Sequence, residues 1–178
     1  MEVEKAILGR RSVRSYLDKP VPEDIIKKLL KAGAMAPSAM DRQPCRFIVI
    51  SDTKLIKSLS DKVKEKAGTL GVAARFAERM KLKEDVIFHG APLLVLVVAE
   101  EDKWGDIDSA LAAQNMMLRA YDLGLGSCFI GFATMLADEL ALMRSLGLKD
   151  GQRLVCPLIF GFPKGWPEPK SREARVQK

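Results

Sequence analysis

An uninterrupted apolar run from Ala91 to Ala99 narrows the possible folds of this chain more than any other segment. The run is far shorter than the roughly 20 apolar residues that a membrane-spanning helix needs, so we expect no membrane span. Its part from Leu93 to Ala99 is typical of a strand that is buried on both faces. Such a strand predicts a sheet with helices on both sides.

Three further strands and several helices are expected from hydrophobic periodicity and from the positions of Gly and Pro. The expected strands are 47–50, 127–130 and 154–160. The expected helices are 3–8, 22–36, a helix that begins after Asp52, a helix over 107–123 that Gly124 ends, and 137–146. The segment 68–88 is expected to be helical but irregular, in the manner of a flap.

The chain has 178 residues, of which 48% are hydrophobic, which is enough apolar material for one core. We therefore expect a single domain over 1–178, with the Pro-rich segment 161–178 as an extended tail. The three cysteines are odd in number and widely spaced, which argues against disulfides and zinc and favours the cytoplasm. The N-terminus has acidic residues and no apolar stretch of signal length, so we expect no export.

The net charge of +6 favours an anionic partner, such as nucleic acid or a phosphorylated cofactor. Only 6% of the residues are aromatic, and no basic patch is interleaved with Phe or Tyr that would stack on bases. We therefore expect no nucleic-acid partner. A basic binding module without a redox cofactor remains an alternative.

The first candidate site is the string GRRSVRSY, in which Arg10, Arg11, Ser12 and Arg14 follow the first expected helix. Guanidinium groups match phosphate oxygens and a serine hydroxyl adds a further donor, so this string is able to clamp a phosphate. A solvated basic turn has the same composition, and the residues alone do not decide between the two.

Two other segments offer groups to a ligand. In APSAMDRQPCRFIVI, residues 36–50, two prolines stiffen a loop that carries Ser38, Asp41 and Gln43. In LGLGSCFIGF, residues 123–132, glycines let backbone amides approach a flat ligand closely. The second segment is not a dinucleotide-binding fingerprint, because its order is helix, glycines, strand, and Phe129 stands where that motif needs Gly.

In this order and at these spacings, the three segments and the Pro-rich basic tail from Gly161 to Arg172 resemble the nitroreductase family of flavin enzymes. The resemblance covers nearly the whole chain. It implies an α+β fold, a three-layer α-β-α sandwich with a mixed, mainly antiparallel central sheet, and an intertwined homodimer. It also implies FMN as the cofactor, NADH or NADPH as the electron donor, and nitroaromatics, quinones or flavins as acceptors.

The resemblance further implies roles for individual residues. Arg10 and Ser12 match positions that hold the FMN phosphate, Arg11 matches a backbone contact, and Arg14 matches a position near the pyrimidine edge of the flavin. Ser38, Ala39 and Asp41 match a loop that reaches the flavin from the other subunit. Phe129, Ile130 and Gly131 match the segment along the reactive edge of the flavin. Lys170 and Arg172 match a basic pair of the tail that closes on the phosphate. The tail is expected to pack on the partner subunit.

Two residues depart from the usual pattern of the family, because Asp41 stands where Asn is common and Cys45 where Trp is common. No role is expected for His89, and a redox role for Cys128 has no support in the sequence. No side chain is assigned as an acid or a base, since the flavin supplies the hydride chemistry. A specialised relative, such as a reductive dehalogenase or a flavin-consuming enzyme, remains an alternative.

Overall fold

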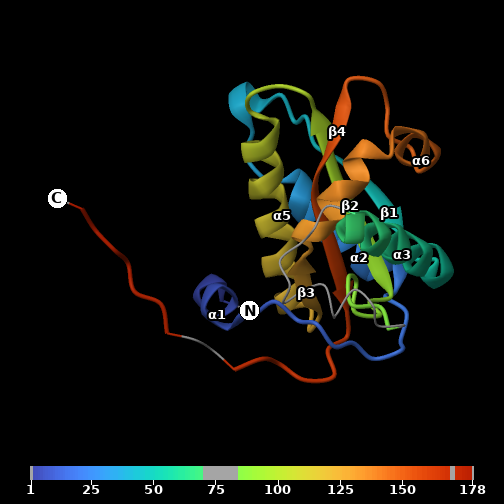
Figure 1. Ribbon diagram of the computed structural model, residues 1–178. Helices are drawn as coiled ribbons and strands as arrows, with labels where there is room; N and C mark the ends of the chain where they lie inside the picture. The colour runs from blue at the N-terminus through green and yellow to red at the C-terminus, as the bar shows by residue number, and fades with distance from the viewer. Residues whose placement is uncertain (1, 70–83, 169–170, 178) are drawn as a thin grey trace.

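Figure 1 shows the computed structural model, which describes residues 2–69, 84–168 and 171–177. Within these residues four strands join in one sheet. The elements in chain order are α1 Val3–Gly9, α2 Glu23–Ala34, the 3-10 helix η1 Ala39–Asp41, β1 Arg46–Ile50, α3 Thr53–Thr69, β2 Leu93–Glu100, α5 Gly105–Asp122, β3 Gly126–Phe129, the 3-10 helix η2 Gly131–Asp138, α6 Leu140–Ser145 and β4 Gln152–Gly161. The expected strands are confirmed, and their ends lie within two residues of the expected positions.

The strand order in the sheet is β1-β2-β4-β3, and all three neighbouring pairs are antiparallel. An isolated parallel bridge joins Ser12 to Ser127 of β3, so the sheet is mixed but mainly antiparallel. The long apolar strand β2 lies between β1 and β4, and its residues from Leu93 to Ala99 are all buried. A central strand with two covered faces is what the apolar run predicts.

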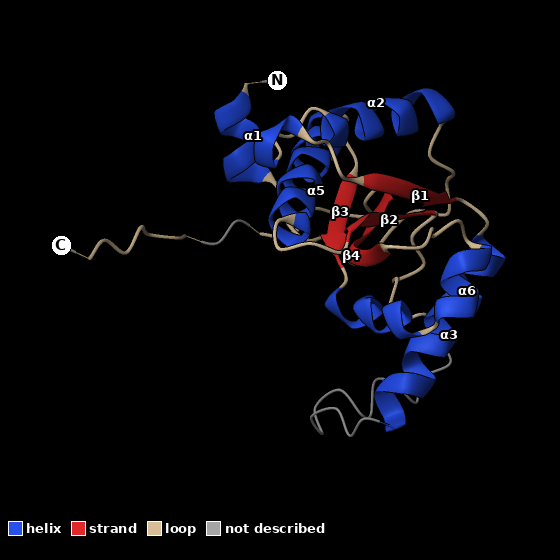
Figure 2. Cartoon of the chain, turned by 90° about the horizontal axis from the view of Figure 1, so that it is seen from above, coloured by secondary structure: helices blue, strands red, loops and turns tan. Residues whose placement is uncertain are grey.

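Alternate side chains of β2 enter two different cores, because successive residues of a strand point to opposite faces of the sheet. Leu93 and Val97 pack in one cluster with residues of α2 and α5, such as Met116. Leu94 and Val98 pack in a second cluster with residues of α3, η2 and α6. Figure 2 shows the sheet between these two helical layers, and the three-layer α-β-α sandwich is thereby confirmed.

The end of α5 is fixed by a glycine, as expected. Gly124 has φ +75°, a left-handed conformation that residues with a Cβ rarely adopt. Its amide donates to the Tyr121 carbonyl at 3.1 Å, and the Leu125 amide donates to the Ala120 carbonyl at 2.8 Å. These two bonds form a Schellman motif, which stops the helix and directs the chain into β3.

Two segments differ from the sequence-based expectation. The expected helix 137–146 is instead the last two residues of η2 followed by α6, because Glu139 leaves the helical region with φ −85° and ψ 62°. Of the segment 68–88, residues 68–69 are helical as expected and end α3, whereas residues 84–88 form bends and turns, so the expected helix is wrong over 84–88. The Asp85 carboxylate organises that turn by accepting from the Ser60 hydroxyl at 2.6 Å and the Phe88 amide at 2.8 Å. The rest of the expected flap lies outside the described residues.

The tail beyond β4 has no helix or strand in its described parts, 162–168 and 171–177. Its beginning is tied to the N-terminal segment, because the Leu17 amide donates to Phe162 O at 2.8 Å and the Lys164 amide to Ser15 O at 3.1 Å. The Trp166 ring then packs edge-on against Tyr121 of the same chain, with 4.8 Å between ring centroids. Packing of the tail on a partner subunit stays a prediction.

None of the described helices is both long and apolar enough to cross a membrane.

Candidate functional site

The basic string after α1 runs alongside β3. The Val13 amide donates to the Ser127 carbonyl at 3.0 Å, and the Val13 side chain is 1% exposed in the core. Gly126 makes this approach possible, because a Cβ at that position would lie 2.7 Å from Val13 Cβ. In an extended segment the neighbours of an inward residue point outward, so Ser12 and Arg14 lie on the outer side of the string.

Cations gather at this edge of the sheet without a carboxylate to balance them. Burial lowers the pKa of Arg10, and the neighbouring charges of Arg172 and Arg11 lower it further. Arg10, Arg14 and the Ser12 hydroxyl all act on the pKa of Cys128, which places them around one thiol. Among the described residues no Asp or Glu forms an ion pair with Arg10, Arg14 or Arg172. An anion is therefore the group that this cluster lacks.

The other two residues of the expected phosphate clamp behave differently. The Arg11 guanidinium turns back to α1 and donates to the Leu8 carbonyl at 2.8 Å and the Arg10 carbonyl at 2.7 Å. It caps the carbonyl end of that helix through Nη1, which holds the guanidinium against α1. Lys170 lies outside the described residues.

Beside the cations, the end of β3 offers one backbone amide. The Ile130 amide donates to the Pro157 carbonyl at 3.0 Å and is therefore occupied. Gly131 begins η2, and the first amides of a helix have no acceptor within the helix. Gly131 is exposed, and the nearby Phe129 side chain is 43% exposed. The Gly131 amide is therefore the donor that a ligand at this edge would meet.

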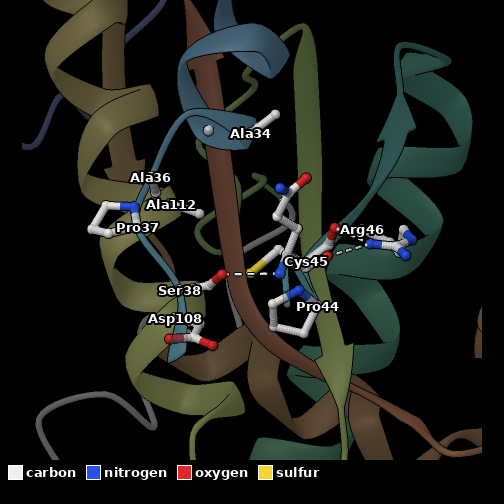
Figure 3. Close-up of a pocket in the computed structure, with 11 residues that line it drawn as sticks. Ala34, Ala36, Pro37, Ser38, Pro44, Cys45, Arg46, Asp108 and Ala112 are labelled. Carbon is white, nitrogen blue, oxygen red and sulfur yellow. Dashed lines mark hydrogen bonds between the residues drawn. The ribbon is translucent and has the colours of Figure 1, made fainter. Parts of the chain in front are cut away.

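The loop 37–44 forms the second expected part of the site, and Figure 3 shows it around a small pocket between α2 and α5. The Ser38 Oγ accepts from the Gln43 amide at 2.9 Å. The Ala39 amide donates to the Asp108 carboxylate of α5, at 3.2 Å to Oδ1 and 3.4 Å to Oδ2. This loop is therefore attached to the first turn of α5.

The two departures from the family pattern fit their surroundings. Asp41 has φ +52°, in the left-handed region that Asn and Asp tolerate better than other residues with a Cβ. Its Oδ1 accepts from Gln43 Nε2 at 3.2 Å, a role that an Asn oxygen would also fill. Cys45 is half-buried, with its Sγ 3.7 Å from Ser109 Oγ, and packs against the core shared by α2 and α5. Its role here is one of packing.

A single chain does not bring the two parts of the site together. The loop 37–44 meets the first turn of α5 through Asp108, whereas Gly9, just before the basic string, lies against Tyr121 in the last turn. Figure 1 shows these segments at opposite ends of the helix. Asp108 and Tyr121 are 13 residues apart, which at 1.5 Å per residue is about 20 Å along α5. Ser38 and Arg10 of one chain are therefore held near opposite ends of this helix.

An apolar surface lies next to the loop. Trp104, Ile107 and Leu111 of the α5 region are 39%, 52% and 40% exposed, and Met40 of the loop is 83% exposed. Together they line a shallow hollow. A contiguous exposed patch of this kind marks an interaction surface.

Asp108 is a site residue that the sequence analysis missed. It is 3% exposed, although it carries a carboxylate. A signal was present, because Asp108 stands four and eight residues before the buried Ala112 and Met116, on the face of the helix that points to the core.

The three cysteines are free thiols that we expect to react slowly in the folded protein. Burial raises the pKa of Cys45 and Cys128, and raises that of Cys156 to about 11. Because the thiolate is the reactive form, alkylation of Cys156 by iodoacetamide at neutral pH should be roughly a hundredfold slower than in the unfolded chain. Mass spectrometry of native and urea-unfolded samples measures this, and equal labelling of both would contradict it.

The structure defines an α+β protein with a three-layer fold and a cluster of cations at one edge of its sheet that has no carboxylate partner among the described residues. The profile of the Nitroreductase family matches residues 7–162. The chain therefore belongs to the nitroreductase family, and the resemblance drawn from the sequence is confirmed.

Individual relatives agree with this assignment along nearly the whole chain. A protein of Archaeoglobus fulgidus whose name includes NAD(P)H nitroreductase is 30% identical over 170 residues, which cover 92% of this chain and 86% of that protein. An NADH dehydrogenase of Thermus thermophilus is 28% identical, with 99% and 95% covered. The crystal structure of a nitroreductase with bound FMN from Bacteroides fragilis has a TM-score of 0.89 and 29% identity, and the match covers 100% of this chain and 98% of that one.

Proposed function

We propose that this protein is an FMN-dependent oxidoreductase that takes electrons from NADH or NADPH and passes them to small oxidised organic acceptors. The observation that carries the proposal is the group of cations Arg10, Arg14 and Arg172, which the described residues leave without a carboxylate partner. A phosphate dianion supplies the missing charge, and the structure of the Bacteroides fragilis relative contains FMN. The residues present therefore fit this cofactor.

The residues of the cluster would contact different parts of the cofactor. Arg10, Arg172 and the Ser12 hydroxyl would hold the phosphate by charge-assisted hydrogen bonds. Arg14, two residues further along the same outer side of the string, would lie at the pyrimidine edge, and the Gly131 amide would donate to the reactive edge. Bound FMN supplies the redox chemistry by accepting a hydride and passing its electrons on. Arg14 would stabilise the negative charge that the reduced ring carries.

The proposed functional unit is a homodimer with a shared site. Because α5 separates the loop 37–44 from the basic string of its own chain, Ser38, Ala39 and Asp41 would serve the flavin held by a second copy. The exposed surface of Trp104, Ile107 and Leu111 beside the loop gives that second copy an apolar face to cover.

The donor and the acceptor would use one place in turn. The sequence has no dinucleotide-binding fingerprint. The nicotinamide would therefore stack on the flavin only while the nicotinamide is being oxidised, and would then dissociate so that the acceptor can bind at the same position. Nitroaromatics, quinones and flavins are the proposed acceptors. Anaerobic reduction of the protein, followed by reoxidation with a panel of these compounds and of halogenated aromatics, would rank them.

The purified protein is expected to be yellow, to bleach anaerobically on addition of NADH or NADPH, and to release FMN on heating. The clamp described above closes on a terminal monophosphate, which FMN has and FAD lacks. Chromatography of the heat-released cofactor measures this. A colourless protein that binds DNA would support the basic binding module instead, and FAD as the main species would overturn the phosphate assignment.

A further inference from the structure

We propose that Asp108 is a positioning residue, which fixes the loop 37–44 in the orientation that the second copy's flavin requires. The inference rests on the proposed function. Its basis is the hydrogen bond from the Ala39 amide to the buried Asp108 carboxylate, which joins positions 69 residues apart in the sequence. Figure 3 shows the carboxylate next to Ser38, on the side of the loop that faces α5.

The buried carboxylate is costly unless the fold uses it. A carboxylate that is 3% exposed loses most of its hydration, and this loss must be offset by hydrogen bonds or by nearby positive charge. The Ala39 amide supplies a hydrogen bond, and the position of Asp108 in the first turn of α5 supplies the positive end of the helix dipole. The hydrogen bond exists only while the loop stays against the helix, so its contribution is lost if the loop moves away.

The loop needs such an attachment because its backbone is strained. Met40, Asp41 and Gln43 all have left-handed φ values, of +54°, +52° and +50°. Each such residue costs free energy that the surroundings must supply. The bonds from Gln43 to Ser38 and to Asp41 lie within the loop and move with it, so they do not fix its orientation.

A second contact to the same helix is weaker. Arg42 pairs with Asp102, just before α5, but the two side chains are 36% and 27% exposed. Ion pairs that are open to solvent contribute little and are screened by salt. The orientation of Ala39, next to Ser38, is therefore set mainly by Asp108.

The test is a pair of substitutions that remove the two ends of one hydrogen bond. Asp108→Ala removes the acceptor. Ala39→Pro removes the donor, and the proline Cδ, which takes the place of the amide hydrogen, also excludes the carboxylate. The local backbone accepts proline, because Ser38 is extended with φ −139° and ψ 158° and proline suits the first position of a helix. Asp108→Asn keeps an acceptor oxygen in a side chain of the same shape. Asp106→Asn is the matched control, because Asp106 is a carboxylate in the same turn of α5 whose partner is Arg153, at 2.7 Å, and not the loop.

FMN titration followed by fluorescence, visible circular dichroism of the bound flavin, and urea unfolding are measured for each variant. Asp108→Ala and Ala39→Pro should each raise the dissociation constant for FMN about ten- to a hundredfold, the range for losing a hydrogen bond to a charged group. The double variant should add little to either. Asp108→Asn should retain most of the affinity and the wild-type dichroism, and Asp106→Asn all of it.

The possible results separate two kinds of failure. Wild-type affinity and dichroism in Asp108→Ala, or fully additive effects of the two substitutions, would overturn the positioning role. If Asp108→Ala fails to fold, Asp108→Asn and Ala39→Pro still decide the matter through their affinities and dichroism. A wild-type protein that binds no FMN in the same titration would overturn the proposed function itself, and this inference with it.

Discussion

Replacing Arg10 with alanine should remove most of the flavin from the protein while leaving its fold intact. A charge-assisted contact to phosphate contributes about 1.5 to 3 kcal/mol, which corresponds to roughly ten- to a hundredfold in affinity. Arg10 has no carboxylate partner among the residues described, and its pKa is lowered by burial and then by repulsion from Arg172 and Arg11. Its removal therefore leaves no buried anion unpaired, and the stability of the cofactor-free protein should not fall.

Arg175→Ala is the control, because Arg175 is an exposed arginine of the tail. Flavin content of the purified variants and the FMN dissociation constant measure the effect, and urea unfolding of the flavin-free proteins measures stability. Equal flavin content in the two variants would mean that the basic string is a solvated turn.

Replacing Ile107 with glutamate should dissociate the proposed dimer and thereby release the flavin. Ile107 is 52% exposed in one chain, in the middle of the apolar surface of the α5 region. Burying an unpaired charge in an interface costs about 3 to 5 kcal/mol, and a symmetric dimer would bury two. Dissociation constants should rise by at least a few hundredfold, and the flavin should be lost because the loop 37–44 would no longer reach it.

Leu140→Glu is the matched control, since Leu140 of α6 is 56% exposed on the opposite side of the sheet. Light scattering gives the mass of each variant, and the absorbance of the same sample gives its flavin content. A monomeric Ile107→Glu protein with full flavin and full activity would refute the shared site. A dimeric variant with wild-type flavin would show that this surface is not the interface.

Features set by local sequence were predictable. The run from Ala91 to Ala99 alone indicated the central strand, because a strand buried on both faces requires consecutive apolar residues. Gly124 indicated the end of α5, because the left-handed turn that ends a helix favours glycine. The helix 137–146 was wrong because Glu139 interrupts it with a conformation that its own neighbours do not demand. No glycine or proline stands there to indicate the break.

Features that depend on distant partners were not predictable from residue patterns. The pairing of Ser12 with Ser127 joins segments more than a hundred residues apart, and only the family resemblance placed them at one site. Asp108 was missed because a carboxylate in the first turn of a helix is ordinarily exposed, and its burial here depends on the loop around Ala39. The separation of this loop from Arg10 by the length of α5 likewise required the fold.

The strand order β1-β2-β4-β3 has a consequence for biosynthesis. β4 is the last of the described strands along the chain, yet it lies inside the sheet, between β2 and β3. Until residue 161 has left the ribosome, β2 lacks its neighbour on that side and β3 has no strand to pair with. Unpaired edges of apolar strands promote aggregation, and pairings between distant segments form slowly. We therefore expect the nascent chain to expose these strand edges until residue 161 emerges, and the sheet edge that carries the basic string to be completed only then.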